Sequence, residues 1–191
     1  MASLKKILYV SRDNGGCNFY RCEQPAKFLK RSGVFDTEIA FRTPSPEQML
    51  SADLVIMQEM GSMNASNLCR FMIEHKIPYV TEFDDFVQHV SPRNLGGYGC
   101  WNPSTLYVHR AMEQARSGFA VQVSTEQLAR EYHPYNPTLF VVPNWLDKDL
   151  WDNMSAKKGD GKLRIGWAGG NAHADDLFMV SKVIERILKE R

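Results

Sequence analysis

The sequence predicts an α/β fold, in which a Rossmann-like parallel sheet carries helices on both faces. Apolar runs of strand length alternate along the chain with segments of helical period. The runs are apolar at consecutive positions, which is typical of strands that are buried on both faces. The helical segments between them provide the crossovers that parallel strands require.

Each element follows from a local signal. The expected strands are 6–10, 37–41, 53–58, 79–83, 118–124 and 138–144. The expected helices are 20–31, 67–75, 104–115 and one that starts after a cap at Ser124 or Thr125. Gly33 marks the end of the first helix, and Pro44 and Pro46 indicate a turn after the second strand.

The end of the chain starts the same pattern again. Residues 152–162 are polar and have no apolar period, whereas 163–177 ("LRIGWAGGNAHADDL") predict a strand, a glycine turn and a helix. The predicted organisation is a Rossmann-like domain over 1–147, a linker over 148–162, and the first βα unit of an incomplete domain over 163–191. Without sheet partners, this unit is expected to be mobile or to self-associate, burying Ile165 and Trp167.

Composition narrows the class of protein. The 191 residues carry 23 Lys and Arg against 22 Asp and Glu, so the net charge of +1 does not favour nucleic acid or an anionic membrane as a partner. Four scattered cysteines without a CxxC pair indicate reduced thiols rather than disulfides or a zinc site. The first apolar run is too short for a signal peptide or a membrane span. We expect a cytoplasmic protein without a transmembrane segment.

Ligands of open parallel sheets bind at the carboxyl ends of the strands. After the first strand, Gly15 and Gly16 would let the backbone approach a ligand closely, or would simply reverse the chain. The loop has neither a GxGxxG fingerprint nor a Walker lysine. Nucleotide binding of the dehydrogenase or ATPase kind is therefore not supported.

A second candidate site follows the fourth strand. Glu82, Asp84 and Asp85 form a carboxylate cluster that can bind sugar hydroxyls, hold a metal or act as a base. The alternative is a solvated acidic turn. His89 can complete a metal or base pair, or can be merely structural.

The same long loop contains two aromatic residues among glycines. Tyr98 and Trp101 lie beside Gly96, Gly97 and Gly99. The rings suit stacking on a sugar or on an apolar acceptor, and they equally suit anchoring of the loop.

Together these motifs resemble glycosyltransferases of family 4, which have the two-domain fold called GT-B. The resemblance rests on "KILYV" with its glycine loop and "YRCEQPAKFL", then "TEFDD", "VVPNWLD" and "LRIGWAGGNAHADDL", in that order. It covers nearly the whole chain, as an N-terminal domain plus the first unit of a C-terminal one.

The resemblance implies a reaction. A sugar would pass, with retention, from a nucleotide-diphosphate sugar to a hydroxyl of a glycan, lipid or protein acceptor. The acceptor would lie mainly on the N-terminal domain, where Asp84 or Asp85 would orient or deprotonate it. No cofactor and no metal are implied. The alternative is a truncated GT-B-like binding or scaffold module without catalysis.

The resemblance also assigns residues. Gly15 and Gly16 match the loop near the donor diphosphate. The full set of substrate-binding candidates is Gly15, Gly16, Arg21, Glu82, His89, Tyr98, Trp101 and Asn144. Pro143, Asn144 and Asp147 match a Pro-Asn-Gly-x-Asp segment, in which Trp145 replaces the glycine.

The donor-phosphate candidates are Gly169, Gly170, Asn171 and His173, before a helix that starts near Ala174. Asp175 and Asp176 complement the dipole of that helix, which offers a purely structural explanation. The remaining donor residues would lie beyond Arg191, so the chain alone is expected to be catalytically incomplete.

Overall fold

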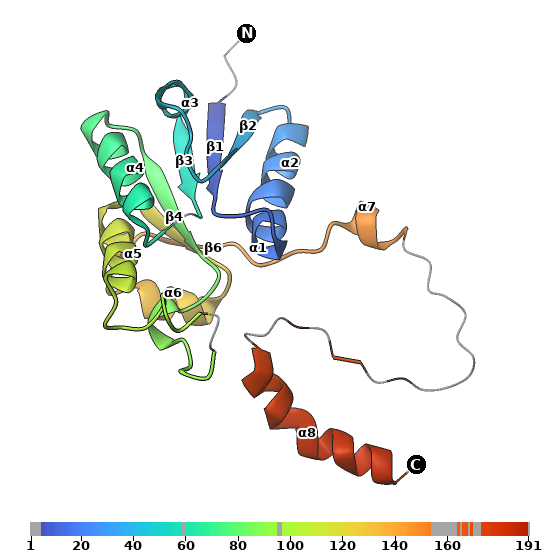
Figure 1. The fold of residues 1–191 in the computed structure, drawn as a ribbon. Helices are drawn as coiled ribbons and strands as arrows, with labels where there is room; N and C mark the ends of the chain where they lie inside the picture. Colours follow the sequence, from blue (N-terminus) through green and yellow to red (C-terminus); the bar gives the residue numbers. More distant parts are fainter. Residues whose placement is uncertain are drawn as a thin grey trace.

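The structure, a computed structural model, describes residues 5–58, 60–94, 97–153, 164, 166, 167, 169 and 173–190. A six-stranded parallel sheet has the order β2-β1-β3-β4-β5-β6 (Figure 1). The strands are β1 (Lys5–Ser11), β2 (Phe35–Phe41), β3 (Leu54–Met57), β4 (Tyr79–Phe83), β5 (Ala120–Val123) and β6 (Leu139–Val141). The fold class predicted from the sequence is confirmed.

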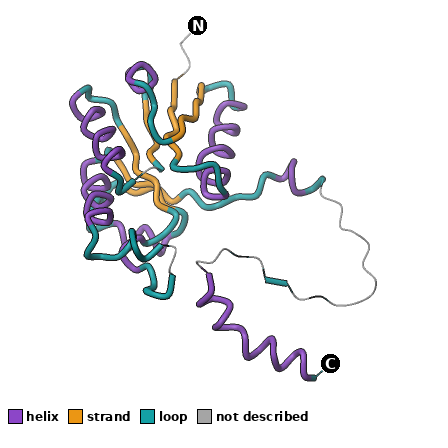
Figure 2. The backbone as a smooth tube through the Cα atoms, in the orientation of Figure 1, coloured by secondary structure: helices purple, strands orange, loops and turns teal. Residues whose placement is uncertain are grey.

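Helices occupy the connections between the strands, and further helices follow β6 (Figure 2). They are α1 (Gly16–Asn18), η1 (Phe19–Glu23), α2 (Gln24–Arg31), α3 (Pro46–Leu50), α4 (Met63–Glu74), η2 (Val87–His89), α5 (Leu106–Ser117), α6 (Glu126–Tyr132), α7 (Lys148–Trp151) and α8 (Ala174–Lys189). Thr125 caps α6 through its side chain, and Gly33 follows α2 with a φ of 71°, as the sequence predicts.

Several predicted boundaries were wrong. The helix expected over 67–75 begins four residues earlier, at Met63. The helix expected from residue 20 already begins at Gly16, and its second part is the π-helical turn η1, where the N–H of Gln24 bonds to the carbonyl of Phe19. The turn expected at Pro46 is instead the start of α3. Ser45 and Gln48 form a reciprocal capping box there, which stabilises a short helix with proline at its first position.

The order in which strands are added to the sheet reverses at β1: β2 lies on one side of it, and β3 to β6 follow on the other. Strand β1 pairs with β2 on one side and with β3 on the other. The connections after β1 and β3 therefore diverge at the carboxyl ends of these strands. In open parallel sheets this switch point is where ligand-binding crevices form.

The two faces of the sheet are covered unequally. One face packs Leu8, Val55 and Met57 against α3 and α4, and its other half packs against α5 and α6. The opposite face packs Ile7 and Tyr9 against η1 and α2. Beyond α2 this second face has an apolar groove of about 580 Å³ along its strands.

The strand expected over 163–167 cannot be compared, because Leu163 and Ile165 lie outside the described residues. Trp167 is 47% exposed. Helix α8 starts at Ala174 as predicted, and Ser91 donates to Asp175 across 2.8 Å at its first turn. Within the described parts, no helix is both long and apolar enough to span a membrane.

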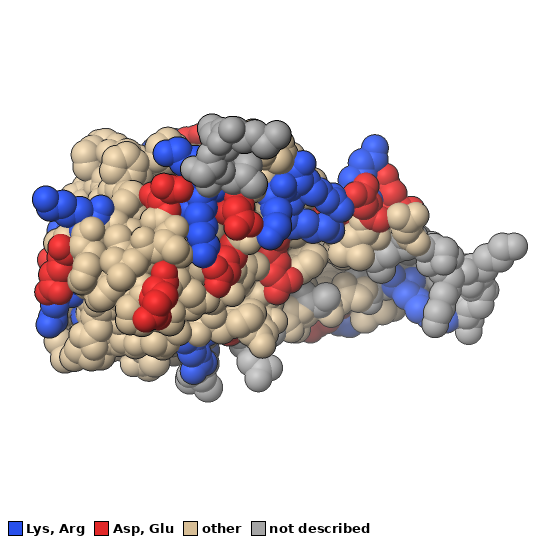
Figure 3. Space-filling view, turned by 90° about the horizontal axis from the view of Figure 1, so that it is seen from above, with Lys and Arg blue, Asp and Glu red and all other residues tan. Residues whose placement is uncertain are grey.

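The surface at the amino ends of the strands carries charges of both signs. Figure 3 shows acidic and basic side chains next to one another on this side. Among the ion pairs near these strand ends are Lys6 with Glu38 at 2.9 Å and Lys30 with Asp36 at 3.1 Å. Such exposed pairs contribute little to stability, so the fold depends on its core.

Replacing Gly61 by alanine is expected to destabilise the domain by at least about 2 kcal/mol. Gly61 has a φ of 78°, and an added Cβ would lie 2.8 Å from the carbonyl oxygen of Tyr107 and would also overlap its ring. Urea unfolding measures the change. Gly99→Ala is the control, because nothing lies within 4 Å of a Cβ there. Equal midpoints for the two variants would contradict the prediction.

Candidate functional site

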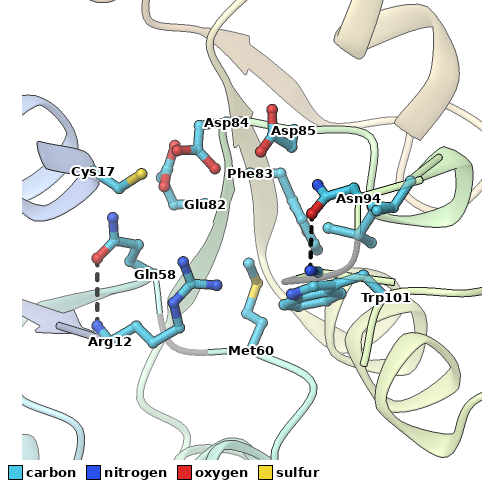
Figure 4. A pocket seen from close by; sticks show the side chains of 13 residues that line it. Arg12, Cys17, Gln58, Met60, Glu82, Phe83, Asp84, Asp85, Asn94 and Trp101 are labelled. Carbon is cyan, nitrogen blue, oxygen red and sulfur yellow. Dashed lines mark hydrogen bonds between the residues drawn. The ribbon is translucent and has the colours of Figure 1, made fainter. Parts of the chain in front are cut away.

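A cavity of about 410 Å³ lies at the carboxyl ends of β1, β3 and β4 (Figure 4). Its lining combines carboxylates, an arginine, a thiol and two aromatic rings. The lining residues are Arg12, Cys17, Gln58, Met60, Glu82, Phe83, Asp84, Asp85, Val87, Val90, Asn94, Gly97 and Trp101. Polar groups that converge in a cavity at this edge define a candidate ligand site.

Strand β4, Ser124 and helix α6 hold Asp84 and Asp85 in place. Phe83, the last residue of β4, stacks on Tyr132 with a centroid distance of 4.3 Å. The hydroxyl of Tyr132 donates to the carbonyl of Asp85 at 2.9 Å, and the hydroxyl of Ser124 donates to the carbonyl of Asp84 at 3.2 Å. These contacts fix the backbone of Asp84 and Asp85. Their two carboxylates lie across the cavity from Arg12 and Met60 (Figure 4).

Charge and burial shift the pKa values of the titratable groups that line this cavity. Burial raises the pKa of Asp85, and the neighbouring Asp84 raises it further, whereas His173 and Arg12 act in the opposite direction. The pKa of the Cys17 thiol is raised by its partial enclosure in the cavity and by the charge of Asp84, although the residue as a whole is exposed.

The third carboxylate, Glu82, is buried. Its Oε1 accepts from Nε of Arg21 at 2.5 Å, and the two side chains are 0% and 1% exposed. Burial raises the pKa of Glu82, and the charge of Arg21 lowers it. Oε2 of Glu82 has no hydrogen-bond partner among the described residues, so it remains able to accept from a ligand or a water molecule.

Arg21 also ties two other segments together. Its Nη1 donates to the carbonyl of Val142 at 2.5 Å and to Oδ1 of Asn144 at 2.9 Å. It lies in the π-helical turn η1. The guanidinium thus links this turn to β4 and to the chain that leaves β6.

A second hydrogen-bond group joins the ends of β1 and β3. Oε1 of Gln58 accepts from the hydroxyl of Ser11 at 3.0 Å and from the backbone N–H of Arg12 at 3.3 Å. The side chain of Arg12 then extends along the cavity (Figure 4). Gln58 therefore positions Arg12 opposite the carboxylates.

The residues predicted from the sequence either line the cavity, lie beside it, or lie elsewhere in the structure. Glu82, Asp84, Asp85 and Trp101 line the cavity together. Arg21 and Asn144 are bonded to each other beside it, and Gly15 and Gly16 precede Cys17 without lining it themselves.

The remaining candidates lie elsewhere. His89 is exposed and packs on Phe86 at 4.7 Å, and Tyr98 contributes its carbonyl to a hydrogen bond from Asn102. Gly169 and His173 are exposed, and Nδ1 of His173 is 2.9 Å from a carboxylate oxygen of Asp176. Gly170 and Asn171 lie outside the described residues.

The described residues contain no group of three or more His, Cys, Asp or Glu side chains placed to hold a metal ion. The sequence analysis missed the lining residues Arg12, Cys17, Gln58, Met60 and Asn94. Arg12 and Gln58 directly follow strands, so the rule that ligands bind at strand ends could have found them.

The fold and the site define a Rossmann-like parallel α/β domain with a polar cavity at its topological switch point. No family model matches the chain, and no curated protein matches it. Among solved structures, it is similar to that of Anabaena Alr3699/HepE in complex with UDP and glucose, with a TM-score of 0.50 and 14% identity. The match covers 77% of this chain and 46% of the HepE chain. At this identity the likeness shows a common fold.

Replacing Arg21 by methionine is expected to destabilise the domain by about 3–5 kcal/mol, because it leaves Glu82 buried and unpaired. The raised pKa of Glu82 sets the pH dependence. The folded variant holds a proton that the unfolded chain releases, so its stability decreases as pH rises above the unfolded value. Chemical unfolding at several pH values measures both effects.

Two further variants test the cause. Arg21→Met combined with Glu82→Leu should recover much of the loss, because no unpaired charge remains. Arg31→Met removes an exposed pair with Asp149 and should cost less than about 1 kcal/mol. A loss at Arg21 as small as that at Arg31 would refute the role of the buried pair.

Proposed function

We propose that the domain is the acceptor-binding part of a GT-B glycosyltransferase of the family 4 type. In this reaction a sugar passes from a nucleotide-diphosphate sugar to an acceptor hydroxyl. The observation that carries the proposal is the cavity with two accessible carboxylates, the unpartnered Oε2 of buried Glu82 and the ring of Trp101. The parallel fold and the order of the sequence motifs support the same assignment.

The chemistry of the cavity suits a sugar or another polyol. Hydroxyl groups donate to carboxylate oxygens, and these charge-assisted bonds are stronger than those between neutral groups. Trp101 offers an apolar surface for a sugar ring. Its edge contact with Tyr107, at a centroid distance of 4.5 Å, fixes its orientation.

Asp85 is the better candidate for the base. Its raised pKa brings it closer to the pH at which a carboxylate can take a proton from the acceptor hydroxyl. Asp84 then orients the acceptor. In a retaining transfer, most of the remaining rate enhancement comes from positioning the two substrates and stabilising the leaving diphosphate.

The donor part of the proposal rests on the fold and on the glycine motifs of the sequence. The HepE structure holds UDP and glucose, and its chain is about twice as long as the part matched here. Gly15 and Gly16 lie at the edge that would face a donor, and Gly169, Gly170, Asn171 and His173 remain the donor-phosphate candidates. Asp175 at the start of α8 is bound to Ser91 and lies 3.6 Å from Arg93, which favours the structural explanation for the acidic turn.

The competing proposal is a binding or scaffold module that has the acceptor surface but no catalysis. Both proposals require acceptor binding in the cavity. They differ in transfer from a nucleotide sugar, which only the enzyme performs once the donor-binding part is present.

Asp84→Asn and Asp85→Asn are expected to weaken sugar binding, at least about tenfold for one of the two, because a charged acceptor of hydroxyl hydrogen bonds is lost. A glycan array selects the ligand, and calorimetric titration gives the affinities. Where the transfer reaction can be measured, its rate should decrease similarly.

Asp36→Asn is the matched control, because Asp36 is a partly exposed carboxylate at the amino ends of the strands. Its affinity should be unchanged. If both cavity variants bind as tightly as the Asp36 variant, the acceptor role is wrong and the carboxylates form an ordinary solvated turn.

A further inference from the structure

A second cavity, of about 420 Å³, adjoins the first one and shares Arg12 with it. It is lined by Arg12, Arg42, Thr43, Ser62, Asn64 and Tyr107. Among the residues that the structure describes, none that lines this second cavity is a carboxylate, whereas the first cavity is lined by Glu82, Asp84 and Asp85. The two neighbouring cavities therefore differ in charge.

The sheet brings the two arginines together. Ser11 and Phe41 are register partners at the ends of β1 and β2, so the residues that follow them leave the sheet side by side. The N–H of Arg42 donates to the carbonyl of Ser11 at 2.7 Å, and its Nε donates to the carbonyl of Arg12 at 2.9 Å. These bonds fix the base of the Arg42 guanidinium and leave its terminal nitrogens for another partner.

The two guanidinium groups differ in how far they are neutralised. Arg42 forms no ion pair with any residue that the structure describes, whereas Arg12 is partly neutralised by its exposed contact with Asp13 at 3.4 Å and by the charge of Asp84. Two like charges on adjacent strand ends repel each other, and an anion between them removes that repulsion. Arginine is also the side chain best suited to bidentate binding of phosphate.

The start of α4 forms another wall of the second cavity. Nδ2 of Asn64 donates to the carbonyl of Arg42 at 2.9 Å and to the hydroxyl of Thr43 at 3.2 Å, which holds the turn after β2 against this helix. The Ser62 side chain caps α4 by accepting from the N–H of Ala65. The positive end of a twelve-residue helix adds to the field of the two arginines.

We propose that this second cavity binds a phosphate group carried by the acceptor. The proposal rests on the acceptor role proposed for the first cavity, and it narrows the substrate class to phosphorylated sugars or polyols, whether soluble or part of a lipid headgroup. The reacting hydroxyl then lies near Asp84 and Asp85, and the phosphate lies between Arg12 and Arg42. Arg12, which lines both cavities, is the point where the two parts of the ligand meet.

Inorganic phosphate is the first probe, titrated into the 191-residue chain at constant ionic strength and followed by amide NMR shifts. Saturable shifts are expected at residues 42–43 and 63–64. Arg42→Gln and Arg12→Gln should each weaken the apparent affinity about tenfold or more, because a charge-assisted bond is lost. Arg70→Gln, an exposed arginine further along α4, should leave it unchanged.

Arg42→Lys provides a second variant that retains the charge, and it should bind phosphate more tightly than Arg42→Gln. Thermal unfolding confirms that each variant folds. Shifts that do not saturate, or equal affinities for Arg42→Gln and Arg70→Gln, would overturn the proposal.

Larger probes separate this inference from the proposed function. Glucose 6-phosphate should bind more tightly than glucose, and the difference should disappear in Arg42→Gln. Co-sedimentation with phosphatidylcholine vesicles, with and without phosphatidic acid, distinguishes a lipid headgroup from a soluble phosphate. If inorganic phosphate binds through Arg42 but no sugar binds, the acceptor role fails and the anion site stands. If glucose and glucose 6-phosphate bind equally tightly, the acceptor role stands and the anion site fails.

Discussion

The buried ion pair of Arg21 and Glu82 is the interaction on which the functional edge of the sheet depends. A charge removed from water costs several kcal/mol unless a partner compensates it, so the π-helical turn and β4 cannot separate without leaving an unpaired charge in the interior. The same guanidinium holds the carbonyl of Val142 and the side chain of Asn144. One side chain therefore fixes the end of the strand that carries Asp84 and Asp85 and also the chain that leaves β6.

Further polar contacts continue from Arg21 along α2. Gln24, Lys27 and Arg31 follow Arg21 at spacings of three, three and four residues, which places successive side chains next to one another on the helix surface. Gln24 donates to the carbonyl of Trp145 at 3.2 Å, Lys27 pairs with Asp147 at 2.8 Å and Arg31 pairs with Asp149 at 3.3 Å. The segment after β6 is thereby aligned with α2 and leaves the domain in a defined direction. Because the inner pairs are the more buried, the anchoring is strongest where the segment is closest to the site.

Sequence reasoning could predict the sheet because buried parallel strands leave a continuous apolar signal. It could also place Asp84, Asp85 and Trp101 near one edge, because strand ends collect there. It could not pair Arg21 with Glu82, since 61 residues separate them and the pairing exists only after β1 and β4 share a sheet. Arg12 and Gln58 also follow strands, so the strand-end rule could have found them, but that they share a cavity with the carboxylates is visible only once the strand order is known. The capping box of Ser45 and Gln48 was a local signal, and it was overlooked behind the two prolines.

The strand order also explains why the edge carries two cavities of different charge. Strand β1 has β2 on one side and β3 on the other, so the residue after β1 faces the connections of both. Arg12 occupies that position, between the carboxylates that follow β4 and the arginine that follows β2. Hydrogen bonds to hydroxyl groups add only modest net affinity in water, because the solvent offers equivalent hydrogen bonds. A charge placed at a fixed distance from the carboxylates adds a requirement that a neutral sugar cannot meet. In the proposed arrangement, the switch point of the sheet contributes to ligand selectivity as well as forming the cavities. It brings the carboxylates after β4 and the arginines after β1 and β2 close enough to contact the same ligand.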